Sequence, residues 1–448
     1  MPDRHERPTN VRWAVFGLAC GTSWLLYLHR YTFAIIKPEL VKEWDLDKVE
    51  LGLLDSALSL TYTSFQFPLG VVADVLGVRI VLTGLILLWC LGLGMHAWSP
   101  SPKYLWYARA TLGIGQSAVY ATLSRLAKGW FPDRIRTTLQ GIVGISAGRL
   151  GGLCAYLLFG SLLLGRCGLD WRTAIYVFVA GGALFALLFA AVFRDSPRTH
   201  PLVNEAEADL IDGQSPGSAT QSSAEPSRMT LGQVLRSIHP RALVNLIALN
   251  IQTILSTLAD NIYSHWIPLF LWEVHHLKYE ALGIYSSLPL LGGAIAGLLG
   301  GVLNDWCIVR TGNRRWSRSG IAFVGKGLAA VLLLTALVWY HNPYAFCGLL
   351  FAVKFFGDWS LVTSWGVVTD IGGRATASVF AFNNAVAGIG LIAAPPLFGY
   401  IAQHYGWPVV FVTVAATYAL CALSWLAIDC TIPVISSEET VGEARSRR

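Results

Sequence analysis

The chain has 448 residues, of which 54% are hydrophobic and only 13% are charged. Soluble globular proteins carry about 25% charged residues, so this composition excludes a water-soluble domain and indicates a body solvated mostly by lipid. The formal charge of +6 comes from basic residues spread over short loops, which gives no basis for nucleic-acid binding.

Hydropathy predicts an all-α membrane protein with twelve transmembrane helices, because a helix needs about 20 apolar residues to cross the bilayer. Residues 1–12 are basic and precede the first span without a small-residue cleavage site, which predicts a retained first helix. The expected spans are 13–35, 50–73, 78–98, 103–130, 136–164, 172–193, 241–272, 279–304, 318–340, 343–370, 374–402 and 407–428.

The spans are expected to form two pseudo-symmetric bundles of six helices. The segment between them is acidic, rich in Ser, Gly and Pro, and has no apolar face, which predicts a flexible linker. Lys and Arg gather in the tails and in the loops on the same side, which favours cytoplasmic termini. The expected location is a bacterial plasma membrane. The predicted organisation is a tail (1–12), a first bundle (13–193), a linker (194–240), a second bundle (241–428) and a tail (429–448).

The chain lacks the motifs of several other protein classes. Its eight cysteines form neither CxxC pairs nor clusters with histidine, so we expect no metal site and no disulfide framework. No G-x4-GK[ST] sequence is present, so energy from ATP is not expected. We therefore expect no cofactor and no enzymatic activity.

Three motifs resemble the major facilitator superfamily. GVVADVLGVR (70–79) is similar to its loop signature, GVLNDWCIVRTGNRR (301–315) to the weaker second copy, and RATLGIG (109–115) to its fourth-helix pattern. The two loop motifs follow corresponding helices of the two halves, as in transporters built from related bundles. The resemblance implies the twelve-helix fold of that superfamily.

Further runs resemble the anion:cation symporter family of hexuronate and galactonate permeases and, more distantly, the glycerol-3-phosphate transporters. This resemblance implies a secondary transporter that binds a small organic anion and a coupling cation, a proton above all, as a monomer in the lipid bilayer. The runs are LYLHRY (26–31), TYTSFQFPLG (61–70), WFPDRIR (130–136), RDSPRTHPLVNEAEADLI (194–211) and HWIPLFL (265–271).

Arg30 lies deep in the first span, where a charge costs about 2.5–3.5 kcal/mol on insertion scales. Tyr27 is three residues earlier and shares its helical face. In the resembling permeases the matching Arg and Tyr bind the substrate carboxylate, a role that suits the planar guanidinium fork. The alternative is that Arg30 extends outward toward Lys37.

The family's two carboxylates are replaced in this chain. Gln116 stands where the permeases carry Glu, on the face of Arg109, and His29 stands where they carry Asp. Glutamine cannot ionise, whereas imidazole titrates near neutral pH. His29 is therefore a coupling candidate, with a satisfied structural histidine as the alternative.

Arg149 lies midway along the fifth span, within the small-residue stretch GISAGRLGGL. Such stretches allow close helix packing. Its arginine adds positive charge to a bundle that has lost two acids, which favours an anionic substrate. The alternative is that Arg149 neutralises Asp55, Asp260 or Asp358.

Other intramembrane polar residues complete the expected site. Tyr62 and Asn383 match family positions, and Asn383 is expected to bind substrate hydroxyls. Asp260 and Asp358 are further coupling candidates, although Lys354 and Asp358 are spaced for a structural ion pair. The expected substrate-binding set is Arg30, Tyr27, Tyr62, Arg109, Gln116, Arg149 and Asn383.

The loop motifs supply a predicted conformational latch. Asp74 is expected to lie near the N-terminus of a neighbouring helix, whose dipole favours an anion, while Arg79 holds the loop and Asp305 is the counterpart in the second copy. The alternative is that these charges only set the topology.

Two rivals to a transporter of sugar acids or other carboxylates stay open. One is an exchanger of organophosphates for phosphate, which the lack of an arginine in the seventh span weakens. The other is a membrane sensor that binds its ligand without carrying it.

Overall fold

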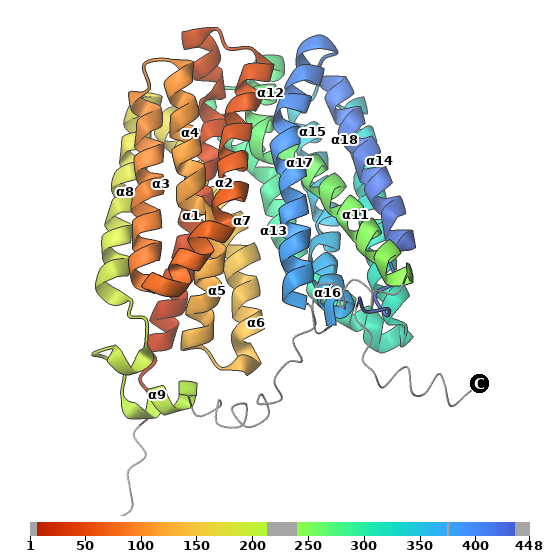
Figure 1. The fold of residues 1–448 in the computed structure, drawn as a ribbon. Helices are drawn as coiled ribbons and strands as arrows, with labels where there is room; N and C mark the ends of the chain where they lie inside the picture. The colour runs from red at the N-terminus through yellow and green to blue at the C-terminus, as the bar shows by residue number, and fades with distance from the viewer. Residues whose placement is uncertain (1–6, 213–239, 374–375, 435–448) are drawn as a thin grey trace, which may run out of the picture. The chain divides into compact units, whose positions relative to one another are not determined.

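A computed structural model describes residues 7–212, 240–373 and 376–434, and these residues form helices and no strand (Figure 1). They separate into two compact units. Unit 1 is Met1–Glu225 with His276–Ser287, and unit 2 is Pro226–His275 with Leu288–Arg448.

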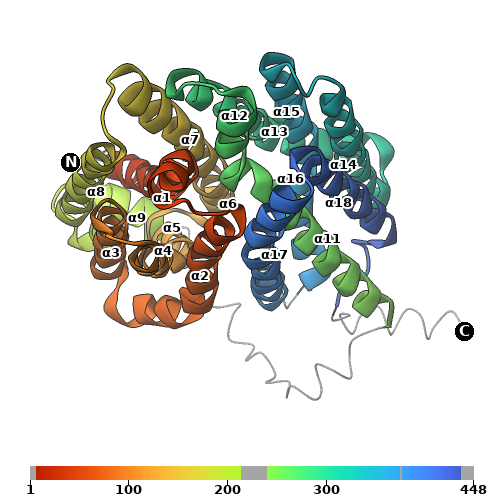
Figure 2. The ribbon, with the colours of Figure 1, turned by 90° about the horizontal axis from the view of Figure 1, so that it is seen from above.

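In unit 1, α3 packs between α4 and α8, α2 packs on α4, and α1 packs on α7 and the π-helical turns beside it (Figure 2). Its helices are α1 (Val11–Trp44), α2 (Lys48–Leu76), α3 (Val78–Trp98), α4 (Pro102–Ser117), α5 (Val119–Trp130), α6 (Asp133–Gly141), α7 (Gly148–Cys154), α8 (Trp171–Val192) and α9 (Glu205–Asp212), with π-helical segments at Ile142–Ala147 and Ala155–Arg166.

In unit 2, α14 packs against α15 and α18, and α11 packs against α17 and α18. The helices are α11 (Pro240–His265), α12 (Ile267–His275), α13 (Tyr279–Thr311), α14 (Arg314–Val338), α15 (Pro343–Gly357), α16 (Trp359–Gly372), α17 (Thr376–His404) and α18 (Trp407–Ala427). The first turns of α13 belong to unit 1 and the remainder to unit 2.

Each predicted span coincides with one helix or with consecutive helices, so the all-α prediction is confirmed. Within the described residues, ten helical stretches are long and apolar enough to cross a membrane, and α2 and α4–α5 are the two predicted spans outside this set. The first span is longer than predicted, because α1 continues through Pro38 to Trp44.

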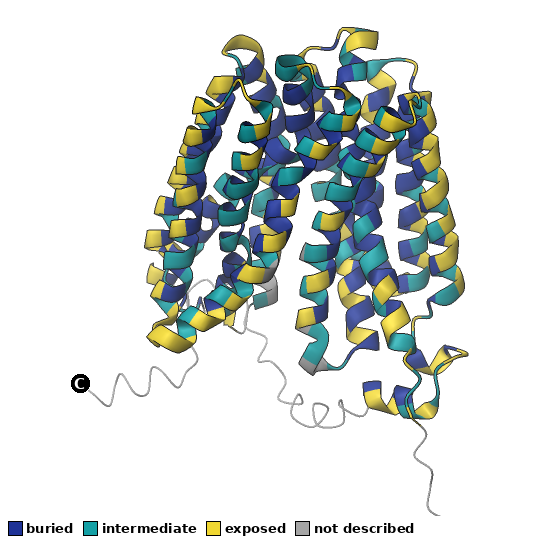
Figure 3. Cartoon of the chain, turned by 180° about the vertical axis from the view of Figure 1, so that it is seen from behind, coloured by how far each residue is buried: buried dark blue, intermediate teal, exposed yellow. Residues whose placement is uncertain are grey.

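The helices expose apolar faces, which identifies an integral membrane protein. Leu184, Leu187 and Leu188 of α8 are exposed, whereas Ala186 and Phe189 on the same helix are buried. Figure 3 shows exposed positions repeating along the outward faces of the helices. Continuous apolar faces of this extent need lipid rather than water as solvent.

The beginning of the predicted linker is folded against the start of α1. Glu207 of α9 is wholly buried, and its carboxylate accepts hydrogen bonds from the Thr9 hydroxyl at 2.6 Å and from the backbone N–H groups of Val11 and Arg12 at 3.1 and 3.0 Å. An anion suits a helix N-terminus because the first N–H groups have no partner within the helix. The rest of the predicted linker, from 213 to 239, and the tail residues 1–6 and 435–448 lie outside the described residues.

Candidate functional site

Unit 1 holds two layers of polar side chains on α1, α2 and α4. Each helix contributes one residue to each layer, and on every helix the two residues are seven positions apart. Seven residues are two helical turns, or about 10.5 Å of rise. The Arg30 cluster consists of Arg30, Tyr62 and Gln116 with Tyr27 beside them, and the ion triad consists of Lys37, Asp55 and Arg109.

In the Arg30 cluster, the guanidinium is fixed on one edge and open on another. Its Nε donates a hydrogen bond to Oε1 of Gln116 at 2.8 Å, and its carbon lies 4.5 Å from the centre of the Tyr62 ring and 5.4 Å from that of Tyr27. Nη2 is buried, and no hydrogen-bond partner for it is found in the described part of the chain. A buried N–H group of a cation is costly to leave unpaired, so this edge is suited to an incoming anion.

Gln116 is held in place through its amide nitrogen, while its amide oxygen contacts Arg30. It is fully buried, and its Nε2 donates to the carbonyl of Leu26 at 3.1 Å, which leaves Oε1 to accept from Arg30. The amide therefore orients the guanidinium without neutralising it. An acid at this position would form an ion pair with Arg30, so the replacement preserves the positive charge for a ligand.

Two glycines of the RATLGIG motif set the position of α4. A Cβ on Gly113 would lie 2.2 Å from the Thr61 hydroxyl oxygen, and one on Gly115 would lie 2.6 Å from the backbone nitrogen of Trp89. Any larger residue would push α4 away from α2 or α3. These glycines thus fix the close packing of α4, the helix that carries Gln116, on α2 and α3.

The ion triad is closed to solvent. The side chains of Lys37, Asp55 and Arg109 are all 0% exposed, and Asp55 lies 2.6 Å from both the Lys37 Nζ and the Arg109 Nη2. Arg109 also donates to the Leu54 carbonyl at 3.2 Å and lies 4.1 Å from the centre of the Phe33 ring. The sequence predicts that Arg109 binds the substrate, and the structure places its guanidinium against the Asp55 carboxylate of α2.

The ion triad also accounts for the length of α1, which continues past the predicted end of the first span. Lys37 can be buried because its ammonium pairs with the Asp55 carboxylate, and a paired lysine can remain in an apolar helix. Arg30 does not extend toward Lys37, because its Nε donates to Gln116 within the Arg30 cluster, whereas Lys37 belongs to the ion triad.

The small-residue stretch around Arg149 packs directly on α1. A Cβ on Gly151 would lie 2.1 Å from the Trp24 carbonyl oxygen, and one on Gly148 would lie 2.6 Å from the Tyr27 ring. Arg149 follows Gly148 on α7 and is half-buried. Its role in binding stays a prediction.

His29 lies on a different face of α1 from Arg30. It is 0% exposed, and its ring centre is 6.0 Å from that of Phe178 on α8. Neither ring nitrogen has a hydrogen bond within the described residues. Successive helix residues point in different directions, which is why neighbours in sequence have such different surroundings here. A coupling role for His29 stays a prediction.

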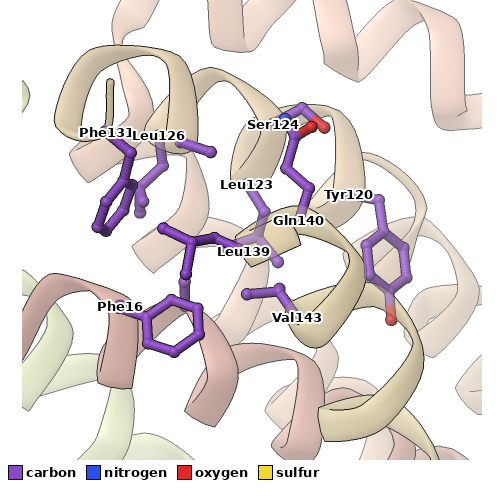
Figure 4. A pocket seen from close by; sticks show the side chains of 11 residues that line it. Phe16, Tyr120, Leu123, Ser124, Leu126, Phe131, Leu139, Gln140 and Val143 are labelled. Atoms are coloured by element: carbon purple, nitrogen blue, oxygen red, sulfur yellow. The ribbon is translucent and has the colours of Figure 1, made fainter. Parts of the chain in front are cut away.

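An apolar pocket lies among α1, α5, α6 and the π-helical segment that follows α6. Phe16, Phe131, Leu139 and Val143 line it, and Tyr120 lies at its edge (Figure 4). The Tyr120 hydroxyl is 2.9 Å from the Ser23 hydroxyl. This lining has no charged group, so the pocket is not suited to an anion.

Unit 2 holds an amide cluster and a charged cluster. Asn383 is buried, and its Nδ2 donates to the Thr253 hydroxyl at 2.9 Å and to Oδ1 of Asn250 at 3.3 Å. Lys354 lies 2.8 Å from Asp260 and 2.7 Å from Asp358. The expected Lys354–Asp358 ion pair is therefore present, with Asp260 as a second carboxylate on the same ammonium.

The residues of the predicted latch are placed at the ends of helices. Asp74 accepts from Nη1 of Arg125 on α5 at 3.1 Å, and Arg79 donates through Nε to the Ala190 carbonyl at 2.8 Å. The N-terminus of α3 is capped by Asp195, whose Oδ1 accepts from the backbone N–H groups of Val78 and Arg79 at 2.6 and 3.1 Å. Asp305 of α13 is exposed. A latch function stays a prediction.

Gly77 of the first loop motif has a structural reason to be glycine. Its φ is +85°, which side-chain-bearing residues rarely adopt, and a Cβ there would lie 3.2 Å from the Asp195 carboxylate. The loop motif and the RDSPR run are thus parts of one junction.

Sequence reasoning missed several of these partners. It named Lys37 and Asp55 only as alternatives, and it assigned no role to Glu207, Asp195 or Arg125. The seven-residue spacing shared by α1, α2 and α4 was the available signal for the ion triad. Asp195 and Glu207 lie in the run 194–211 that resembles the family, but the sequence did not indicate their partners, because their donors lie more than 100 residues away in sequence.

The comparison with protein families decides the identity of the fold. The family model described as the Major Facilitator Superfamily matches residues 19–334 and 249–443. The chain belongs to the Major Facilitator Superfamily. The two loop motifs and the RATLGIG motif lie within the matched residues.

Within the superfamily, the chain is similar to curated transporters of the hexuronate permease type. It is 29% identical to a probable sulfoacetate transporter, SauU, of Cupriavidus necator, over 97% of this chain and 98% of the relative. It is 25% identical to a D-galactonate transporter of Escherichia coli, covering 96% of this chain and 98% of that one. It is also 25% identical to the hexuronate transporter of Escherichia coli K12, covering 96% and 97%.

A solved superfamily structure shares the fold. A bacterial homologue of the human lysosomal transporter Spinster, in an inward-facing and unoccupied conformation, aligns with a TM-score of 0.68 over 93% of this chain and 95% of its own. The sequence identity is 15%, so this likeness concerns the fold alone.

Proposed function

We propose that this superfamily member is a secondary transporter that carries a small organic anion across the plasma membrane by alternating access. The observation that carries the proposal is the half-buried guanidinium of Arg30, oriented by Gln116 and Tyr62, with a buried Nη2 that has no hydrogen-bond partner within the described residues. A guanidinium presents parallel N–H donors to a carboxylate or sulfonate and stays charged at every physiological pH.

The charge of the two layers supports an anionic cargo. The Arg30 cluster and the ion triad hold Arg30, Lys37 and Arg109 against the single carboxylate of Asp55. These side chains give the two layers a net positive charge, which is costly within a membrane and favours an anion over a neutral or cationic cargo.

The names of the relatives agree with this class of substrate. They include a sulfoacetate transporter, a D-galactonate transporter and a hexuronate transporter. Tyr27 and Tyr62 are the residues of unit 1 that we propose to contact the remainder of the substrate. Energy would come from an ion or substrate gradient, since the sequence has no ATP-binding motif.

Counterflow in proteoliposomes tests the proposal. Purified protein would be assayed with sulfoacetate, D-galactonate, D-glucarate and D-glucuronate as internal and external anions, and with a sugar phosphate against phosphate. Accelerated exchange of one carboxylate or sulfonate supports the proposal. Exchange of phosphate and sugar phosphate alone would establish the organophosphate alternative, and ligand-induced thermal stabilisation without flux would establish a sensor.

A further inference from the structure

Unit 2 contains a charged cluster that anion binding in unit 1 does not use. The cluster joins Asp260 of α11, Lys354 of α15, Asp358 at the end of α15 and Tyr418 of α18. Lys354 lies between the two carboxylates, and the Tyr418 hydroxyl donates to the same Oδ1 of Asp260 at 2.7 Å. Four polar groups thus converge inside an apolar bundle.

The members of the cluster differ in their access to solvent. The side chains of Lys354 and Asp358 are 2% and 1% exposed, whereas that of Asp260 is 28% exposed. Of the two carboxylates, Asp260 is therefore the one that is accessible from outside the packed bundle. Because Lys354 also holds Asp358, it keeps a carboxylate partner when Asp260 becomes neutral.

Asp260 can form hydrogen bonds with its neighbours in both of its protonation states. When Asp260 is ionised, its oxygen accepts from Lys354 and from Tyr418. When Asp260 is protonated, it becomes a donor, and a tyrosine hydroxyl can accept as well as donate. A proton can thus enter and leave without stranding a buried polar group, which would otherwise cost about 1–3 kcal/mol.

The groups around Asp260 account for the charge in each state. On its own helix the Tyr263 ring lies 5.4 Å from the Lys354 ammonium, and from α14 Lys326 lies 4.8 Å from the centre of the Tyr418 ring. Lys326 donates to Ser256 of α11 at 2.8 Å, and from α18 the Cys421 thiol contacts Gln252 of α11. Lys326 and Lys354 together balance Asp260 and Asp358. Protonation of Asp260 makes this set +1, a charge suited to a step in which an anion is taken up.

The Lys354–Asp260 ion pair joins α11 and α15, two helices that otherwise pack on different neighbours. α11 packs on α17 and α18, while the Lys354–Asp260 ion pair ties it to α15. Asp358 lies between the end of α15 at Gly357 and the start of α16 at Trp359. Removing the charge of Asp260 therefore weakens a contact beside the junction of two helices.

We propose that Asp260 is the proton-coupling site of this transporter, with Lys354, Asp358 and Tyr418 as its positioning residues. This inference rests on the proposed transport function. The proton enters from water on one side of the membrane, forms an O–H bond at the Asp260 carboxylate, and is released to water on the other side, so no other reactant is needed.

Protonation can be measured without a substrate. Infrared difference spectra of the purified protein, perfused alternately with acidic and alkaline buffer, should show a protonated carboxyl band that is absent in Asp260→Asn. Tyr418→Phe keeps the carboxyl but removes its hydroxyl partner, so it should shift the band rather than abolish it. If Asp260→Asn fails to fold, the Tyr418→Phe shift still identifies the group. A band unchanged in both variants would overturn the proposal.

Coupling is measured in proteoliposomes with the membrane potential clamped at zero and sulfoacetate or D-galactonate as the anion. A gradient of one pH unit is worth about 1.36 kcal/mol, so one coupled proton per anion supports roughly tenfold accumulation in the wild type. Asp260→Asn should accumulate no anion above equilibrium while retaining counterflow. The matched control is Asp209→Asn, because Asp209 is exposed on α9 and should leave accumulation unchanged.

The outcomes separate this inference from the proposed function. Wild-type accumulation in Asp260→Asn, or loss of counterflow together with accumulation, would overturn the coupling role. A wild-type protein that shows counterflow but no response to the pH gradient would also overturn it, while leaving anion transport established. Absence of counterflow in the wild type would instead refute the proposed function, and the infrared result alone would then decide whether Asp260 binds the proton.

Discussion

Replacing Arg30 with lysine is the sharpest test of the anion site, because it keeps the charge and removes the geometry. The Nε of Arg30 that donates to Gln116 at 2.8 Å is lost, and so is the planar surface that lies 4.5 Å from the Tyr62 ring centre. The Lys ammonium remains a cation in the same bundle. The Gln116 amide keeps its bond to the Leu26 carbonyl, so the fold should be retained.

The magnitude follows from the contacts that disappear. A lysine cannot offer two parallel donors to a carboxylate, and it no longer has the amide that fixes its direction. One charge-assisted hydrogen bond is worth about 1.5–3 kcal/mol. We therefore expect anion binding to weaken by about 2–3 kcal/mol, which is roughly a 30- to 160-fold increase in Kd.

The assay is titration of the purified protein with the anion that gives the fastest counterflow, followed by thermal stabilisation or tryptophan fluorescence. Arg198→Lys is the matched control, because Arg198 is exposed and pairs with Asp209 on the surface. The control should bind within twofold of the wild type, since surface substitutions usually change free energies by less than about 0.5 kcal/mol. If Arg30→Lys also binds within twofold, the guanidinium does not bind the anion and the site must be sought elsewhere.

Three further substitutions test the surroundings of the site. Gln116→Glu would place a carboxylate on Nε of Arg30, where it would compete with the ligand. Anion binding should therefore weaken by roughly 10- to 160-fold at neutral pH and recover as acidic buffer neutralises the new carboxyl. Equal affinity at all pH values would contradict this. Asp55→Asn would leave Lys37 and Arg109 without their shared carboxylate, and the free energy of unfolding should fall by about 3–5 kcal/mol, visible as a lower thermal midpoint; an unchanged midpoint would show that the triad is not structural. Glu207→Gln should lower the free energy of unfolding by about 2–4 kcal/mol, because several hydrogen bonds to a charged acceptor are lost. The control is Glu205→Gln, since Glu205 is exposed on the same helix. Equal stability of the two variants would exclude a capping role for Glu207.

Much of the fold could be predicted because its signals are local in sequence. Each membrane helix needs a continuous apolar run. Small residues such as Gly113 and Gly115 indicate that neighbouring helices pack closely. Arg30 stood out for the same reason, since a charge in an apolar run is costly at any position near the bilayer centre. These properties do not depend on the neighbouring helices.

Sequence patterns were sufficient for the membrane class, the positions of the helices and the superfamily, and they singled out Arg30 as the candidate for binding an anion. Only the tertiary structure decided which polar residues meet. It placed Arg109 on Asp55, enclosed His29 beside Phe178, and put Lys354 between Asp260 and Asp358. The physical reason is that the cost of a buried charge depends on its partner, and the partner is set by helices that are far apart in sequence and adjacent only after packing.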